Sequence, residues 1–109
     1  MIDFDKIKEV KIENFKGGKG FVIARIYDDG NNKIMKATLQ KDCSIGMHTH
    51  DNSSEIIYVF NGNASCVIDG KKEIINKGKC HYCPKGSTHS IKNENDEDLV
   101  MFCVVTINN

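Results

Sequence analysis

The sequence predicts an all-β fold, arranged as a sandwich or a barrel. Three observations support this prediction. Helical periodicity is almost absent, short apolar runs dominate, and clusters of Gly, Asn and Asp interrupt these runs. The runs recur about every 8–12 residues, which is the spacing of strands joined by short turns. Nine or ten short strands are expected in total.

The first half of the chain is expected to open with a strand and then a hairpin. Residues 7–15 alternate imperfectly between apolar and polar positions, which favours a strand over a helix. Residues 21–27 (FVIARIY) form an apolar run, and the polar turn 28–32 (DDGNN) follows it. Residues 33–39 then return as the partner strand.

The second half of the chain carries six more apolar runs with strand composition. They are residues 55–60, 64–68, 71–75, 79–83, 89–93 and 99–107. Asp69-Gly70 is a two-residue hairpin signal, and Pro84, the only proline, ends the run before it. The acidic stretch 93–98 (NENDED) is expected to be a solvated loop.

Length and composition exclude several classes of protein. With 109 residues, 39% of them hydrophobic, the chain suits one soluble globular domain spanning residues 1–109. Its 15 basic and 15 acidic residues balance, so no electrostatic footprint for nucleic acid or a membrane surface is expected. The N-terminus lacks the pattern of a signal peptide, which predicts a cytoplasmic protein. The five cysteines, an odd number, are then expected to be free thiols.

Two short segments together supply four potential metal ligands. His48 and His50 are two residues apart, so on a strand both imidazoles would point to one face. Glu55 begins the next apolar run, and an adjacent antiparallel strand would bring it level with the two histidines. His89 follows the turn Pro84-Lys85-Gly86 in the second segment. Imidazole and carboxylate groups suit a divalent ion such as iron, manganese, nickel or zinc.

The spacing of these residues resembles the two sequence motifs of the cupin superfamily. The first motif covers residues 42–62, with His48, His50, Glu55 and Gly62 in place. The second covers residues 78–93 and matches completely; its residues are Gly78, Pro84, Gly86, His89 and Asn93. Asp42 replaces the glycine that opens the first motif, and aspartate tolerates the same turn geometry. The resemblance implies a small cupin jelly-roll β-barrel (a double-stranded β-helix) that holds a metal on His48, His50, Glu55 and His89.

The resemblance leaves the activity open, because cupins include enzymes, sugar-binding modules and storage proteins. A six-coordinate ion would keep two positions free for a ligand, whereas a tetrahedral zinc would be closed and structural. We therefore expect a metal-dependent enzyme acting on a small anionic or enediol-like molecule, of dioxygenase, isomerase or lyase type. The alternatives are a metal-loaded module that binds a small ligand such as a sugar, and a purely structural barrel.

Residues outside the motifs give further expectations. His81 shares a strand face with Cys83, so it either lines the cavity as a candidate catalytic acid or base, or is a hydrogen-bonded structural histidine. Inward rows from two strands would line the cavity; they contain Met35, Ala37, Met101 and Cys103. Cys80 and Cys83 would face opposite ways on a strand, which disfavours a disulfide.

The oligomeric state is a separate expectation. A short barrel leaves sheet edges that small domains often cover by pairing. Small cupins are commonly dimers, so a homodimer is expected, with residues 7–15 as a reasonable partner surface.

Overall fold

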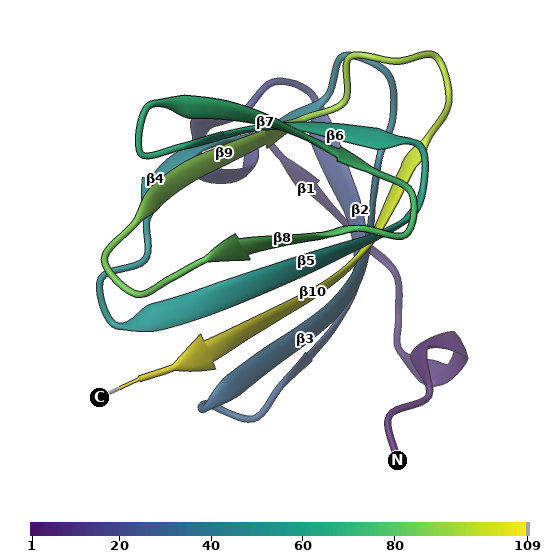
Figure 1. The fold of residues 1–109 in the computed structure, drawn as a ribbon. Coiled ribbons are helices and arrows are strands. Elements are labelled where there is room, and N and C mark those ends of the chain that lie inside the picture. The colour runs from purple at the N-terminus through teal and green to yellow at the C-terminus, as the bar shows by residue number, and fades with distance from the viewer. Residues whose placement is uncertain (109) are drawn as a thin grey trace.

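The computed structural model describes residues 1–108, which form ten strands in two facing antiparallel sheets (Figure 1). The strands are β1 (Val10–Glu13), β2 (Phe21–Asp28), β3 (Asn32–Leu39), β4 (Ser44–Thr49), β5 (Ser53–Asn61), β6 (Asn63–Ile68), β7 (Lys71–Asn76), β8 (Cys80–Cys83), β9 (Thr88–Lys92) and β10 (Leu99–Ile107). The helical elements in this range are two 3-10 turns, η1 (Phe4–Lys6) and η2 (Phe15–Gly17). The all-β prediction is therefore confirmed.

The two sheets differ in size, and the polypeptide crosses from one to the other repeatedly. The larger has the order β1-β2-β3-β10-β5-β8, and the smaller has the order β4-β9-β6-β7. From β3 onward the chain passes from one sheet to the other at every connection except the β6–β7 hairpin, which is the jelly-roll arrangement. Within residues 1–108, no helix has the length and apolar character needed to cross a membrane.

The turns adopt the backbone geometry that their residues predict. Asp69 and Gly70 both have positive φ, at 47° and 81°, as expected for a two-residue hairpin turn between β6 and β7. Asp42, which stands where the cupin motif has glycine, has φ 65°. Aspartate is one of the few residues that tolerate this left-handed conformation. The substitution therefore leaves the turn before β4 intact.

The hydrophobic core fills one end of the barrel. Strand β10 illustrates this, because its inward residues run from the closed end to the open end. Leu99 and Met101 are fully buried and pair with Leu39 and Ala37 on β3. Val105, two steps beyond Cys103, is only partly buried and lies beside the cavity at the other end.

The N-terminal region differs from the sequence expectation. Only Val10–Glu13 pairs as a strand, at the edge of the larger sheet, and residues 15–17 form a 3-10 turn instead. Asn14 and Lys16 both have positive φ, at 50° and 56°, which interrupts the extended backbone. This polar, glycine-rich stretch 14–20 therefore folds over β4 rather than continuing the sheet.

Two glycines let the stretch 14–20 lie directly against β4. A Cβ atom on Gly18 would overlap the carbonyl of Ser44, and one on Gly46 would overlap the carbonyl of Lys16. The contact is fixed by two hydrogen bonds between Lys19 and Ser44, at 2.8 and 2.9 Å. Only hydrogen atoms fit between the two backbones.

Candidate metal centre

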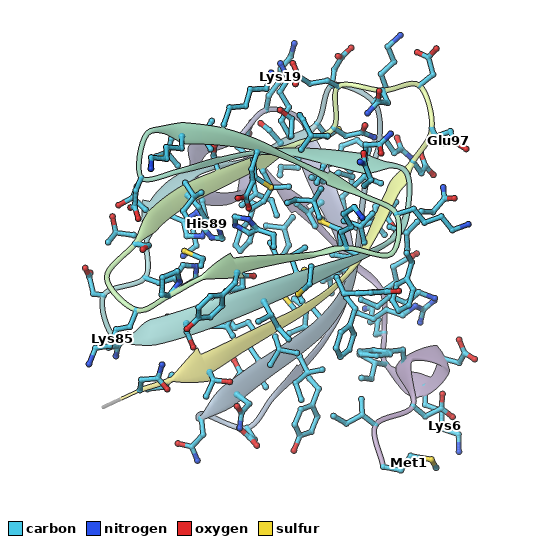
Figure 2. The ribbon with its side chains drawn as sticks, viewed as in Figure 1. Met1, Lys6, Lys19, Lys85, His89 and Glu97 are labelled. Atoms are coloured by element: carbon cyan, nitrogen blue, oxygen red, sulfur yellow. The ribbon has the colours of Figure 1, made fainter. Side chains whose placement is uncertain are left out.

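The four expected ligands meet inside the barrel, but from both sheets. His48 on β4 lies directly opposite His89 on β9 in the smaller sheet. Figure 2 shows His89 between the two layers of the barrel. His50 lies just past the end of β4, where its backbone bonds Ser87 and Gly86 at 3.0 and 2.7 Å.

Glu55 reaches the centre from the larger sheet. It was expected on a strand adjacent to the two histidines, but β4 pairs with β9 and β5 pairs with β10 and β8. The polar residues 50–52 carry the chain from one sheet to the other, so Glu55 faces the histidines across the barrel. The ligand set therefore spans both sheets.

The nitrogen and oxygen atoms of these four side chains converge on one point. One potential ligand atom from each lies within 4.8 Å of all the others. Nε2 of His89 is 3.0 Å from Nε2 of His50 and 3.1 Å from Nε2 of His48. The Glu55 carboxylate is 3.0 Å from Nε2 of His50 and 3.1 Å from Nε2 of His89.

These separations test whether a metal ion fits the site. Two atoms about 2.1 Å from the same ion are about 3.0 Å apart at a right angle, and about 3.4 Å apart in a tetrahedron. The four short separations are 3.0–3.1 Å and so match right-angle pairs. Right angles are typical of six-coordinate ions. The donor set therefore fits a six-coordinate divalent metal better than tetrahedral zinc.

Burial and hydrogen bonding together set the charge of Glu55. The side chain is 8% exposed, and burial on its own would raise the pKa of the carboxyl group. Hydrogen bonds from His50 and His89 outweigh burial and, with the charge of these imidazoles, lower the pKa of Glu55 to about 2. Burial also lowers the pKa of His48. The site at neutral pH thus holds an ionised carboxylate beside a neutral His48 imidazole.

Each histidine has its second ring nitrogen engaged outside the cluster. Nδ1 of His48 is 2.7 Å from the carbonyl of Gly46, which can only accept, so His48 donates from Nδ1. Its Nε2 is then left with a lone pair. Nδ1 of His50 is 2.8 Å from the Ser53 hydroxyl, and Nδ1 of His89 is 2.9 Å from Nε2 of His81. Such outer contacts orient metal-binding imidazoles.

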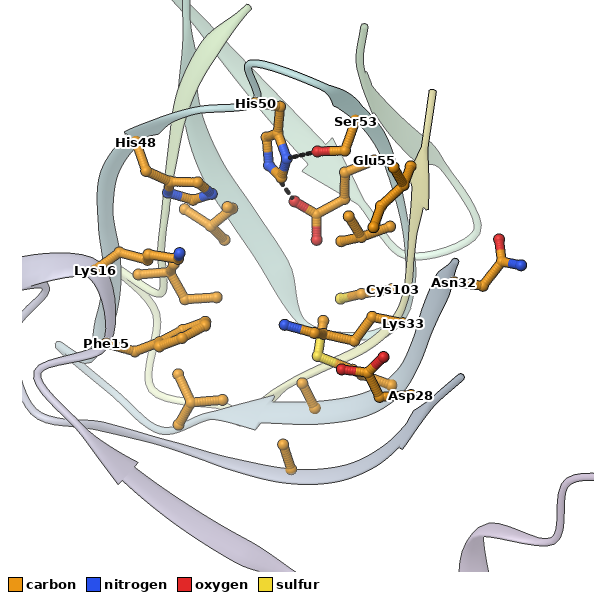
Figure 3. A pocket seen from close by; sticks show the side chains of 18 of the residues that line it. Phe15, Lys16, Asp28, Asn32, Lys33, His48, His50, Ser53, Glu55 and Cys103 are labelled. Atoms are coloured by element: carbon orange, nitrogen blue, oxygen red, sulfur yellow. Dashed lines mark hydrogen bonds and ion pairs between the residues drawn. The ribbon is translucent and has the colours of Figure 1, made fainter. Parts of the chain in front are cut away.

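A cavity of about 450 Å³ lies against this cluster (Figure 3). His48, His50 and Glu55 line it directly, and its floor is largely apolar. Figure 3 shows the side chains of Lys16 and Lys33 extending into the pocket from opposite walls. Any molecule in this cavity would meet the His–Glu cluster on one side and two ammonium groups on others.

The expected lining residues divide into two groups. Met35, Ala37 and Cys103 line the cavity. Met101 faces inward as expected, yet it does not line the cavity, because it packs in the core towards the closed end. Lys33 was not anticipated, although it continues the alternating row of Met35 and Ala37 by two residues. That alternation is the signal that could have found it.

His81 lies behind the cluster rather than in the cavity. It is fully buried and shares its strand face with Cys83, while Cys80 and Tyr82 are exposed. It is not among the cavity-lining residues, and it contacts His89 and Glu73 instead. Glu73, like Lys16 and Lys33, is a residue that the sequence did not reveal.

All five cysteines are free thiols. Burial is the main reason that the pKa of Cys66 rises to about 12 and that of Cys83 to about 11. Protonated buried thiols are poor nucleophiles and poor metal ligands.

The fold and the cluster together define a small double-stranded β-helix protein with three histidines and one glutamate gathered inside the barrel. The chain belongs to the cupin family, because residues 35–105 match the cupin domain model. This confirms the resemblance seen in the two motifs.

Similar proteins agree with this assignment. An oxalate-binding protein of Thermotoga maritima is 30% identical over 108 residues, covering 94% of this chain and 89% of its own. A crystal structure described as a predicted oxalate decarboxylase, also from Thermotoga maritima, superposes with a TM-score of 0.91 at 26% identity over 98% of both chains. A sugar phosphate isomerase of Silicibacter pomeroyi has a TM-score of 0.78 at 18% identity, covering 97% of this chain and 74% of its own, and so shares the fold.

Proposed function

We propose that this protein is a divalent-metal-dependent cupin enzyme whose substrate is a small organic anion. His48, His50, Glu55 and His89 would hold the metal. The observation that carries the proposal is the 3.0–3.1 Å spacing of four pairs of their ligand atoms, which matches right angles at an ion, beside a cavity of about 450 Å³. Four protein ligands on a six-coordinate ion leave two positions for a bound molecule.

The charges around the cavity support an anionic substrate. Glu55, with its pKa lowered to about 2, contributes one negative charge, so a divalent ion keeps a net charge of about +1. Lys16 and Lys33 extend into the same cavity and add positive charge to its walls. The apolar residues around Met35 restrict water near the bound anion, which strengthens these attractions.

The metal, when bound, would supply Lewis acidity that polarises a substrate oxygen. The side chains of this protein would do the rest. Lys33 would pair with the carboxylate of the substrate, and Lys16 would close the opposite side of the cavity. Oxalate is the first compound to test, because it is small, doubly charged and able to occupy two adjacent metal positions. The 30% identity to a protein named for oxalate binding supports this choice.

The alternative is a metal-loaded module that binds such an anion without changing it. One observation favours this alternative. Glu55 is hydrogen bonded to His50 and His89, and His81 does not line the cavity, so neither is free beside the bound molecule. Besides Glu55, the acidic residues that line the cavity are Asp28 and Asp51. Chemistry that needs a general acid would depend on one of them.

The decisive experiment measures metal content and then the fate of the anion. Protein purified without added metal, and again after incubation with iron, manganese, nickel or zinc, is expected to hold about one ion per chain. His50→Ala should lose this ion. Met47→Ala, an exposed residue on β4, the strand that leads into His50, is the matched control and should retain it. Wild-type protein that binds none of the four metals would overturn the proposal.

Oxalate titrated into the metal-loaded protein is then followed by calorimetry and by product analysis. Binding with turnover supports the enzyme, and binding without turnover supports the module. Oxalate that neither binds nor reacts would refute a small dicarboxylate as the ligand. Lys33→Met should weaken binding of the anion while leaving the metal content unchanged.

A further inference from the structure

We propose that Glu73 and His81 form a hydrogen-bonded chain that orients His89 and increases its strength as a metal ligand. The inference rests on the proposed metal site and deepens it. It makes His81 a positioning residue rather than a catalytic one, and it assigns a role to a partly exposed carboxylate that lies outside both sequence motifs.

The hydrogen-bonded series consists of two short contacts. Nδ1 of His89 lies 2.9 Å from Nε2 of His81, and Nδ1 of His81 lies 2.6 Å from the carboxylate of Glu73. The two imidazole planes differ by only 11°, so the rings lie nearly parallel. His81 and His89 are fully buried, whereas the Glu73 side chain is 43% exposed. The series therefore runs from the metal site to the surface.

The direction of each hydrogen bond follows from the chemistry of the groups. If Nε2 of His89 binds a metal, the proton of this neutral ring must sit on Nδ1. His89 then donates to Nε2 of His81, whose own proton must be on Nδ1. His81 in turn donates to Glu73, and an ionised carboxylate only accepts. Glu73 accepts the last hydrogen bond of the series, so each N–H donor in the series has an acceptor.

The negative charge at the end of the series acts on the metal ligand. A carboxylate draws the shared protons outward, which leaves more electron density on Nε2 of His89. The three residues come from three strands, β7, β8 and β9, and His81 belongs to the opposite sheet from the other two. The series therefore also ties the edge of one sheet to the metal-binding face of the other.

The test compares Glu73→Gln and Glu73→Ala with wild type. Glutamine keeps an acceptor but removes the charge, and alanine removes both. We expect metal affinity, measured by competition with a chelator, to fall about 10-fold for Glu73→Gln and about 100-fold for Glu73→Ala. The visible spectrum of the cobalt-loaded protein should shift in the same order. Glu13→Gln, an exposed residue on β1, is the matched control and should resemble wild type.

Each outcome is informative. Unchanged affinity and spectrum in both variants would overturn the role of Glu73 while leaving the metal site intact. Weaker binding with an unshifted spectrum and an equally lowered melting temperature in the metal-free state would indicate a purely structural role and would also overturn it. Failure of the proposed function would be distinguishable, because the wild type itself would then bind no metal.

Discussion

The metal-free protein should lose stability as the pH is lowered, and part of this loss should come from the charge of Glu55. Removing that charge should therefore remove this part of the pH dependence. The carboxyl group is almost fully buried, and hydrogen bonds from His50 and His89 lower its pKa from 4.5 to about 2. A group whose folded-state pKa is lowered stabilises the fold above its unfolded-state pKa. That stabilisation is lost as the pH falls towards the folded-state pKa. The relevant window is therefore pH 4.5 to about 2.

The size of the effect follows from the two pKa values. A difference of this size corresponds to about 3 kcal/mol of unfolding free energy. Solvent screening reduces it little, because the side chain is only 8% exposed. Glu55→Gln keeps the shape of the side chain and one acceptor oxygen but cannot ionise. Between pH 4.5 and about 2, the unfolding free energy of the wild type should therefore fall by about 3 kcal/mol more than that of the variant.

The assay is urea unfolding of both proteins after treatment with a chelator, at pH steps from 6 to about 2. The difference between the two curves reports Glu55 and the histidines to which its charge is coupled, because the acidic groups outside the site contribute equally to both. Parallel curves across the whole range would refute the reasoning that the histidine contacts hold Glu55 ionised.

Three further predictions concern the rest of the molecule. Cys80 is the exposed cysteine, so one thiol per chain should react rapidly with a thiol reagent under native conditions, and a count of five would contradict the burial of the others. Asn93 is fully buried and donates to the carbonyls of Leu39 and Glu97 at 2.9 and 2.8 Å. Asn93→Leu should lower the free energy of unfolding, measured in urea, by about 3 kcal/mol. A loss below about 1 kcal/mol would show that these bonds contribute little to stability. The expected homodimer should appear in light scattering as twice the 12.2 kDa of one chain, and a monomer at micromolar concentration would count against it.

The sequence predicted the parts of this protein that depend on local pattern. Strand alternation placed His81 and Cys83 on one inward face, as the structure has them. The tolerance of aspartate for positive φ explained how Asp42 could open the first motif. These features are set by neighbouring residues, so one stretch of sequence is enough to read them.

The features that the sequence did not reveal depend on how the strands are arranged in the two sheets. Glu55 faces the histidines across the barrel because β4 pairs with β9 rather than β5. Glu73 sits among the exposed residues of β7, and only the approach of β7 to β8 brings it within 2.6 Å of His81. A carboxylate in a polar run carries no local sign of such a contact. Met101 was misplaced for a related reason, since alternation gives the face but not the depth in the barrel.

The close approach of Gly18 and Gly46 decides how this cavity can be redesigned. Neither position accepts a side chain, so the contact between β4 and the stretch 14–20, which carries the cavity residues Phe15 and Lys16, keeps one geometry. A library intended to change which molecules enter should leave both glycines alone. It should instead vary Lys16 and the turn 29–31 on the far wall, where Gly30 and Asn31 also border the cavity and no ligand residue is touched. With both glycines kept, any change in selectivity can be assigned to the residues that were varied.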